Sequence, residues 1–174
     1  MKDRNLNHKD DWETPKELYN SLVEEFGVMF DPCPLRSSFN GLNILWRSAN
    51  FINPPYSRKL KEQFIRKAYE ESKKGKLCVM LLPVSTSTKI FHEIIYPNAE
   101  IRFIKGRVKF IGINTFGEKV TNKCGMHDSM IVIFNNRKEY IDEIISDNTE
   151  GEEPMQSVSE LVGDDNINNQ KFLS

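Results

Sequence analysis

The stretch Leu77–Leu82 reads Leu-Cys-Val-Met-Leu-Leu, is apolar at every position and is followed at once by Pro83. A strand with one face in water would alternate apolar and polar residues, whereas a continuous apolar run is typical of a central strand that is covered on both faces. Helical patterns precede and follow this run. Such alternation of strands and helices predicts a compact α/β fold, with a mostly parallel sheet and helices on both faces.

The first predicted helix has a full set of start signals. Thr14 is positioned to cap it, Pro15 occupies the first helical position, and Glu17 completes a capping box. Apolar residues then recur at helical spacing up to Gly27, which favours a helix end. The remaining pattern predicts helices at 58–74, 89–96 and 140–145, a basic loop or hairpin edge at 105–110, a mobile loop at 112–127, and strands at 28–31, just before Asn53, and at 76–82, 100–104 and 129–134.

A chain of 174 residues is long enough for one domain with a sizeable core. We expect a flexible N-terminus over residues 1–11, one domain over 12–145, and an acidic disordered tail over 146–174. Residues 1–138 hold 23 Lys and Arg against 15 Asp and Glu, whereas residues 139–174 hold 1 against 10. A basic body fits a polyanion-binding surface that the acidic tail could screen, although ordinary solvated charge explains the same numbers.

Other features of the sequence limit the classes of protein to which the chain could belong. No apolar run approaches the roughly 18 residues of a membrane span, and the polar first residues do not resemble a secretory signal. The three cysteines (Cys33, Cys78, Cys124) are odd in number and widely spaced, which argues against a disulfide framework and for a reducing, cytoplasmic location. Neither they nor the three histidines have the spacing of metal ligands, so we expect no metal.

The segment Asn53-Pro54-Pro55-Tyr56 is predicted to follow the carboxyl end of a strand, which is where open α/β sheets bind ligands. Its two prolines remove backbone donors and leave carbonyls that only accept. Asn53 adds a side-chain carbonyl, and Tyr56 adds a flat ring. Together they suit a planar amine on an aromatic base, although Asn-Pro-Pro is also an ordinary turn sequence.

This tetrapeptide resembles the Asn/Asp-Pro-Pro-Tyr/Phe motif of S-adenosylmethionine-dependent amino-methyltransferases, which act on adenine N6, cytosine N4 or a glutamine amide. The sequences Leu-Pro-Val-Ser-Thr-Ser-Thr-Lys and Ile-Arg-Phe-Ile-Lys-Gly-Arg-Val-Lys-Phe, between Leu82 and Phe110, extend the resemblance. It covers roughly residues 10–135 and is similar to the phage-type DNA N6-adenine methyltransferase (Dam-like) family. The resemblance implies a compact Rossmann-like methyltransferase fold, S-adenosylmethionine as cofactor, and DNA as partner.

The resemblance also implies roles for individual residues. Asn53, Pro54, Pro55 and Tyr56 would form the catalytic group, holding a flipped-out adenine by its amine and its ring. The cofactor would contact the segments that carry Trp12, Thr14, Pro15, Asp31, Pro32, Cys33 and Asn40. DNA would be held by Ser57, Lys105, Arg107, Lys109 and Phe110, the last of these covering the second face of the adenine.

The sequence departs from the family pattern at two places. Pro34 and Leu35 stand where methyltransferases usually have a glycine-rich turn, and Asn40 stands where the family has an acid. Trp46, a few residues on, is expected in the core because an indole ring buries a large area. For Phe110 an alternative stays open, in which it is the inward residue of a hairpin. Two alternative functions also stay open: methylation of RNA or of a protein glutamine, and nucleic-acid binding without catalysis.

Overall fold

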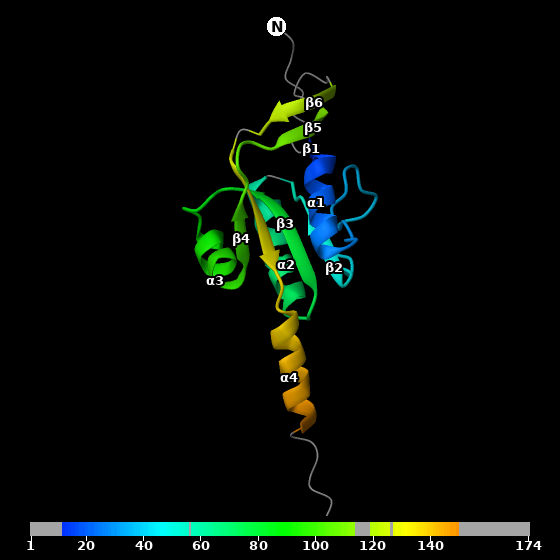
Figure 1. The fold of residues 1–174 in the computed structure, drawn as a ribbon, viewed down its shortest axis with the longest axis vertical. Coiled ribbons are helices and arrows are strands. Elements are labelled where there is room, and N and C mark those ends of the chain that lie inside the picture. The colour runs from blue at the N-terminus through cyan, green and yellow to red at the C-terminus, as the bar shows by residue number, and fades with distance from the viewer. Residues whose placement is uncertain (1–11, 56, 114–118, 126, 150–174) are drawn as a thin grey trace, which may run out of the picture.

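The computed structural model describes residues 12–55, 57–113, 119–125 and 127–149. Its centre is a four-stranded sheet in the order β2-β3-β7-β4 (Figure 1). The strands are β2 (Ala49–Ile52), β3 (Leu77–Pro83), β7 (Ser129–Phe134) and β4 (Glu100–Phe103). Phe30 extends this sheet beyond β2 through an isolated parallel bridge to Asn50.

The sheet is mixed, so the prediction of a mostly parallel sheet is wrong. β2 pairs with β3 in parallel, but β7 pairs antiparallel with both β3 and β4. It follows that β2, β3 and β4 run in one direction and that β7 lies reversed between the last two. The strand–helix–strand connections before β4 are those of the prediction. A parallel strand needs a crossover connection, usually a helix. Between β4 and β7 the described residues form the strands β5 and β6 and contain no helix, which fits the reversed direction of β7.

Because of these directions, the carboxyl ends of β2, β3 and β4 meet the amino end of β7 at one edge of the sheet. Two hydrogen bonds fix that edge: Val84 N donates to Asp128 O at 2.8 Å, and Ile104 N donates to Ser129 O at 3.0 Å. The segments that leave this edge begin at Asn53, Val84 and Ile104. We call this edge the sheet rim.

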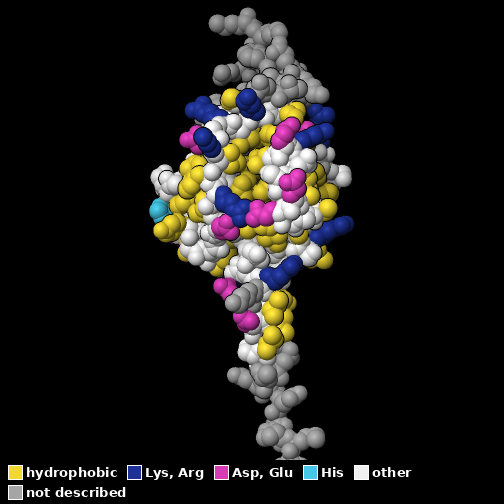
Figure 2. All heavy atoms as spheres, in the orientation of Figure 1, with side chains coloured by type: hydrophobic (Ala, Val, Ile, Leu, Met, Phe, Trp, Pro, Cys, Tyr) yellow, Lys and Arg dark blue, Asp and Glu magenta, His cyan; other side chains and the backbone are white. Residues whose placement is uncertain are grey.

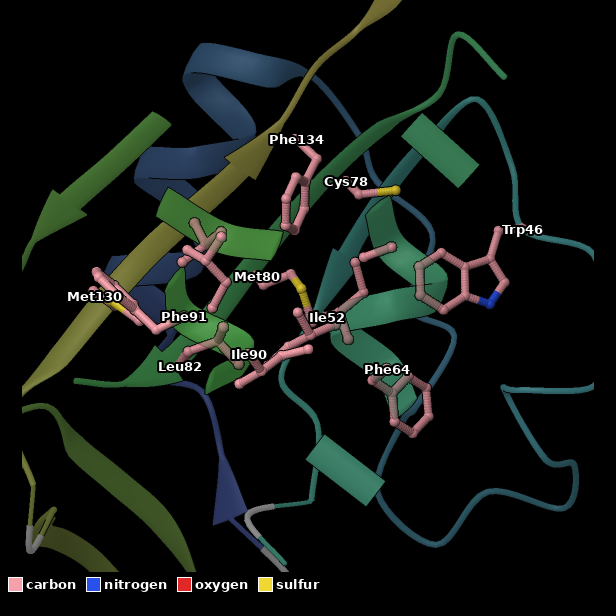
Figure 3. Packing of buried hydrophobic residues seen from close by; sticks show 14 residues of the cluster. Trp46, Ile52, Phe64, Cys78, Met80, Leu82, Ile90, Phe91, Met130 and Phe134 are labelled. Carbon is pink, nitrogen blue, oxygen red and sulfur yellow. The ribbon is translucent and has the colours of Figure 1, made fainter. Parts of the chain in front are cut away.

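Helices cover both faces of the sheet, as predicted. One face packs against α2 (Arg58–Ser72) and the π-helical turn η2 (Phe91–Ile95), which α3 (Tyr96–Asn98) follows directly, and the other packs against α1 (Lys16–Phe26). Along β3 the side chains alternate between the faces: Cys78, Met80 and Leu82 join the first cluster (Figure 3), and Leu77, Val79 and Leu81 join the second. Every residue of β3 is buried, which explains its continuous apolar sequence.

Trp46 lies in the first cluster, as expected for an indole ring (Figure 3). Its ring stacks on Phe64 with centroids 6.3 Å apart. Its Nε1 donates to Gly41 O at 2.8 Å, so the one polar atom of the side chain is satisfied.

A second, smaller sheet has the order β1-β5-β6 and lies at the end of the molecule beyond the rim (Figure 1). Its strands are β1 (Trp12–Glu13), β5 (Lys109–Ile113) and β6 (Lys119–Cys124). β1 pairs antiparallel with β5, which places Trp12 opposite Gly112. Both alternatives for residues 105–110 are observed in part: residues 105–108 form a loop, and residues 109–110 begin the hairpin strand β5. Part of the segment predicted as a mobile loop forms β6.

Two predictions about the ends of helices need correction. α1 begins after Pro15 without any side-chain cap, so the predicted capping box of Thr14 and Glu17 does not form. The last helix, α4 (Arg137–Thr149), is longer than expected and runs past Ile145. The predicted flexible N-terminus (1–11) and residues 150–174 of the predicted tail lie outside the described residues.

In the part of the chain that the structure describes, no helix has the length and apolar character to cross a bilayer.

Candidate active site

A cavity of about 590 Å³ opens beside the carboxyl end of β2. Seven of the residues predicted for catalysis or for cofactor binding line it: Trp12, Thr14, Asp31, Cys33, Asn53, Pro54 and Pro55. They come from three separate segments, namely β1 and the turn after it, the turn after Phe30, and the segment that follows β2. The fold therefore brings together residues that are up to 43 positions apart in the sequence.

Asn53 is held in one orientation at this cavity. Its Nδ2 donates to Trp12 O at 3.1 Å and to Thr14 Oγ1 at 3.2 Å. A backbone carbonyl only accepts, so the amide nitrogen, and not the oxygen, must face Trp12. Asn53 Oδ1 has no donor among the described residues and keeps its capacity to accept. This explains what Thr14 does in place of capping: it anchors the side chain of Asn53.

Asp31 and Cys33 form a tight turn against the same segment. Asp31 Oδ1 accepts from Cys33 N at 2.8 Å, and Cys33 Sγ donates to Asn53 O at 3.4 Å. The turn thus fixes both the Asp31 carboxylate and the backbone of Asn53. Burial raises the pKa of Asp31 above its ordinary value, and the bond from Cys33 N opposes that rise. A cation in the cavity would stabilise the ionised carboxylate.

Burial also raises the pKa of the Cys33 thiol well above its usual range, and the negative charge of Asp31 adds to the effect. Cys33 is therefore a neutral thiol at physiological pH, and a neutral thiol is a poor nucleophile. Its contribution at the cavity is the hydrogen bond to Asn53 O. The described residues contain no group of three His, Cys, Asp or Glu side chains that could hold a metal ion.

Three residues predicted for cofactor binding do not line the cavity. Pro15 is the residue that precedes α1, and Pro32 is fully buried behind the Asp31 turn. Asn40 is exposed, and its Oδ1 accepts from Leu42 N at 3.0 Å in a local turn. Gly41 packs so closely behind Pro32 that a Cβ at this position would overlap the Pro32 carbonyl. The loop of Asn40 therefore supports the Asp31 turn from behind.

The residues predicted to bind DNA lie outside this cavity. Lys105, Arg107 and Lys109 are exposed at the end of the molecule that carries the small sheet, where Figure 2 shows several basic side chains. Arg107 Nε lies 3.9 Å from Asp128 Oδ1. Ser57 is exposed at the start of α2 and makes no side-chain cap bond, contrary to our expectation that it caps this helix. Tyr56 lies outside the described residues.

Phe110 is only 4% exposed and belongs to the second core cluster. Its ring also fills the space beside Gly125, whose Cβ position would lie 3.2 Å from Phe110 Cε2. A ring in this position has no free face for a base. The structure favours the alternative in which Phe110 is the inward residue of a hairpin.

Sequence reasoning missed several residues that line the cavity, among them Lys16, Tyr19, Asn20, Arg36 and Phe51. Tyr19 meets Phe51 edge to face, with ring centroids 5.2 Å apart. A signal for the helical residues was present: positions 16, 19 and 20 of α1 share one face because they are three and four residues apart. They follow directly on Thr14, so a ligand that reaches Thr14 also meets this face.

The cavity thus contains two cationic and several aromatic side chains, together with the carboxylate of the Asp31 turn and the hydrogen-bonded amide of Asn53. The amino-acid sequence matches a family model described as DNA N-6-adenine-methyltransferase (Dam) over residues 3–162. Searches among curated proteins and among solved structures give no match.

Proposed function

The chain belongs to the DNA N-6-adenine-methyltransferase (Dam) family, and from that premise we propose that it transfers a methyl group from S-adenosylmethionine to N6 of an adenine in DNA. The observation that carries the proposal is the anchored amide of Asn53. Its nitrogen is committed to Trp12 and Thr14, so its oxygen remains as an acceptor. An exocyclic amine donates two hydrogen bonds, and we assign the second acceptor to the backbone carbonyl of Pro54, a residue that lines the same cavity.

The cavity fits S-adenosylmethionine by chemistry and by size. Its volume of about 590 Å³ lies within the usual range of small-molecule sites. Asp31 is a half-buried carboxylate that forms no ion pair with another described residue, and burial raises its pKa. The cofactor carries an ammonium and a sulfonium charge that could pair with it. Lys16 and Arg36 are available for the cofactor carboxylate, and Tyr19 offers a ring beside its adenine. When bound, the cofactor supplies the electrophilic methyl group.

The protein would then act by positioning and polarisation. Two acceptors on the N6 hydrogens draw the nitrogen lone pair out of conjugation with the ring and orient it. They also stabilise the positive charge that develops on N6 during transfer. Adenine N6 is inaccessible inside a duplex, so the base has to leave the stack before it reaches Asn53. Tyr56, two residues beyond Pro54, is the ring we assign to stacking on the extruded base.

The test is methyl transfer to mixed-sequence DNA from labelled S-adenosylmethionine, followed by mapping of the modified bases. We expect label on adenine N6. Asn53→Ala should lower the rate by at least about a hundredfold, as expected for removal of one oriented polar group at a reacting centre. The matched control is Asn43→Ala, because Asn43 is exposed in a loop away from the cavity. Near-normal methylation by Asn53→Ala would remove Asn53 from the catalytic role.

The same assay separates the alternative functions. Label on RNA or on a protein glutamine, with none on DNA, would assign a different amino substrate to the same acceptors. A protein that binds DNA but not labelled cofactor would be an inactive relative. Cofactor binding by Asp31→Ala should be weaker than binding by the unsubstituted chain, because this change removes the carboxylate that we assign to the cofactor cations.

A further inference from the structure

A second cavity, of about 360 Å³, opens at the sheet rim on the opposite face, between the start of α2 and the segment that follows β3. Its floor is apolar and includes Leu82, Ile90 and Phe91, which Figure 3 shows within the core cluster. Its wall is polar. It carries the basic side chains Arg58, Lys61 and Lys89 and the hydroxyl side chains Ser85, Ser87 and Thr88.

Two of the three cations already have carboxylate partners. Arg58 Nε lies 3.1 Å from Glu62 Oε1, and Lys89 Nζ lies 3.4 Å from Glu93 Oε1. Lys61 has no carboxylate within 4.0 Å among the residues that the structure describes. It is half-buried, and this burial lowers its pKa against the opposing effect of Glu62. A cation that is partly removed from water without a partner is a binding determinant for an anion.

The described residues of the wall carry little negative charge to oppose these cations. Glu62 is the one carboxylate among the described lining residues, and Arg58 engages it. Thr88 Oγ1 donates to Ser85 O at 2.7 Å and so closes the turn, whereas the hydroxyls of Ser85 and Ser87 have no partner among the described residues. The first turn of α2 contains no acidic residue, so its backbone N–H groups add positive potential.

We propose that this second cavity binds a backbone phosphate of the DNA strand that carries the target adenine. The proposal rests on the proposed function, since it assigns the cavity to the same substrate. Pro55 lines the first cavity and Arg58 lines the second, three residues further along the chain. A strand whose base reaches Asn53 therefore brings a neighbouring phosphate to the start of α2. Phosphate contacts of this kind set the register of a protein on DNA.

The experiment measures binding of the full chain to a labelled duplex by fluorescence anisotropy at several salt concentrations. Lys61→Gln should weaken binding and reduce the slope of log affinity against log salt by about one, the change expected for one lost phosphate contact. Ser87→Ala should weaken binding less, because it removes a hydroxyl and no charge. The matched control is Lys59→Gln: Lys59 is exposed on the same helical turn but does not line the cavity.

A second measurement assigns the contact to one phosphate. Neutral methylphosphonate linkages are placed singly at successive positions along each strand of the duplex. A linkage at one position should weaken binding by the unsubstituted chain and by Lys59→Gln, yet leave Lys61→Gln unchanged, and in a duplex that is methylated this position should lie beside the modified adenine. If Lys61→Gln binds DNA with unchanged affinity and salt slope, the proposal is wrong. It is equally wrong if every linkage affects Lys61→Gln and the unsubstituted chain alike.

These outcomes are independent of methyl transfer, because they report binding alone. If the chain methylates no DNA, but one methylphosphonate position weakens its binding only when Lys61 is present, the proposed function is refuted and the phosphate site is kept. If the chain methylates adenine but shows no such dependence on Lys61, the proposed function is kept and the phosphate site is refuted.

Discussion

The side chains of Asn53 and Thr14 are joined by a hydrogen bond of 3.2 Å, although they lie 39 positions apart in the sequence. The bond ties the segment after β2 to the turn between β1 and α1. It also sets the direction of the Asn53 amide, together with the bond from the same nitrogen to Trp12 O. Thr14, which has the sequence position of a helix cap, therefore helps to orient the side chain of Asn53, the proposed catalytic group.

Thr14→Val should slow methyl transfer while leaving the fold intact. Valine keeps the shape of threonine but removes the oxygen that accepts from Asn53, so the amide keeps only the Trp12 carbonyl as a partner. Misplacement of a reacting group by a fraction of an ångström to 1 Å lowers rates by up to about a hundredfold. We expect a loss of about tenfold in kcat, measured with saturating cofactor and DNA. Thr14→Ser keeps the acceptor and should stay near the unsubstituted rate, and equal loss in both variants would contradict the anchoring role.

Asp31→Asn should stabilise the protein without ligand at neutral pH. The pKa of Asp31 is raised in the folded state, mainly by burial. The corresponding stability is therefore full below the unfolded pKa and is lost as pH rises through the folded pKa. Asparagine cannot ionise, yet its Oδ1 can still accept from Cys33 N. The variant should exceed the unsubstituted chain in free energy of unfolding at pH 7, and the difference should shrink toward about pH 4, near the ordinary carboxyl pKa.

Urea unfolding at the two pH values measures this difference. A gain that is the same at both would show that charge at position 31 is not its cause. The same variant should bind S-adenosylmethionine more weakly at pH 7, because it lacks the carboxylate that we assign to the cofactor cations.

Local sequence patterns predicted the parts of the fold that depend on neighbouring residues. The apolar run of β3 had to be covered on both faces, and it is. The residues after β2 had to lie at the carboxyl end of a strand, and Asn53 does. The family resemblance then named Trp12, Asp31 and Cys33, which share one cavity with Asn53.

Predictions failed where a distant partner decides the outcome. The pairing of Trp12 with Gly112 spans about a hundred residues, and no local pattern encodes it. Thr14 has the spacing of a capping box, but its hydroxyl accepts from Asn53 instead. After Ser129 the sequence of β7 is apolar and is compatible with either direction, so its reversal could not be predicted from it. Asn40 shows the opposite case: it was assigned to the cofactor, but its Oδ1 accepts a hydrogen bond from Leu42 N within a local turn.

Glu71→Gln should destabilise the fold. Glu71 is 4% exposed and lies among Lys67, Lys74 and Lys76. Lys76 Nζ also donates to Trp46 O at 2.9 Å, so the cluster ties α2 to β3 and to the Trp46 loop. Burial opposes ionisation of Glu71, but its bonds to Lys76 and Lys74 prevail and lower its pKa. Removal of the charge should cost about 1–3 kcal/mol of unfolding free energy, the range for a buried group that loses its partner.

The pH dependence has a definite sign. A carboxyl whose folded pKa is lowered contributes stability above its unfolded pKa, and this contribution is lost as pH falls through the folded pKa. The difference between the unsubstituted chain and Glu71→Gln should therefore be full at neutral pH and diminish in acid. Glu70→Gln is the matched control, because Glu70 is exposed and pairs with Lys73 in solvent. A loss of stability that is equal for the two variants would refute the role of the buried cluster.

Phe110→Ala tests whether this ring belongs to the core or to the DNA interface. Phe110 is 4% exposed and packs with Val108 and Ile131 in the second cluster. Loss of a buried phenylalanine costs roughly 3–5 kcal/mol, so we expect a marked drop in melting temperature. Phe103→Ala is the matched control, since Phe103 is an aromatic residue on β4 with 64% exposure. It should melt close to the unsubstituted chain.

The second readout of the Phe110 variants is the fluorescence of 2-aminopurine at the target position, which rises when the base leaves the stack. A core role predicts that Phe110→Ala, at a temperature where it is folded, extrudes the base as the unsubstituted chain does. An interface role predicts normal melting and weak extrusion, and this pair of results would overturn the core assignment. Phe110 lies on β5, the strand that pairs with β1, and its ring fills the space beside Gly125. Its loss should therefore loosen the small sheet, and with it the Trp12 carbonyl that holds Asn53. A lower methylation rate with normal base extrusion is the combined result that we expect.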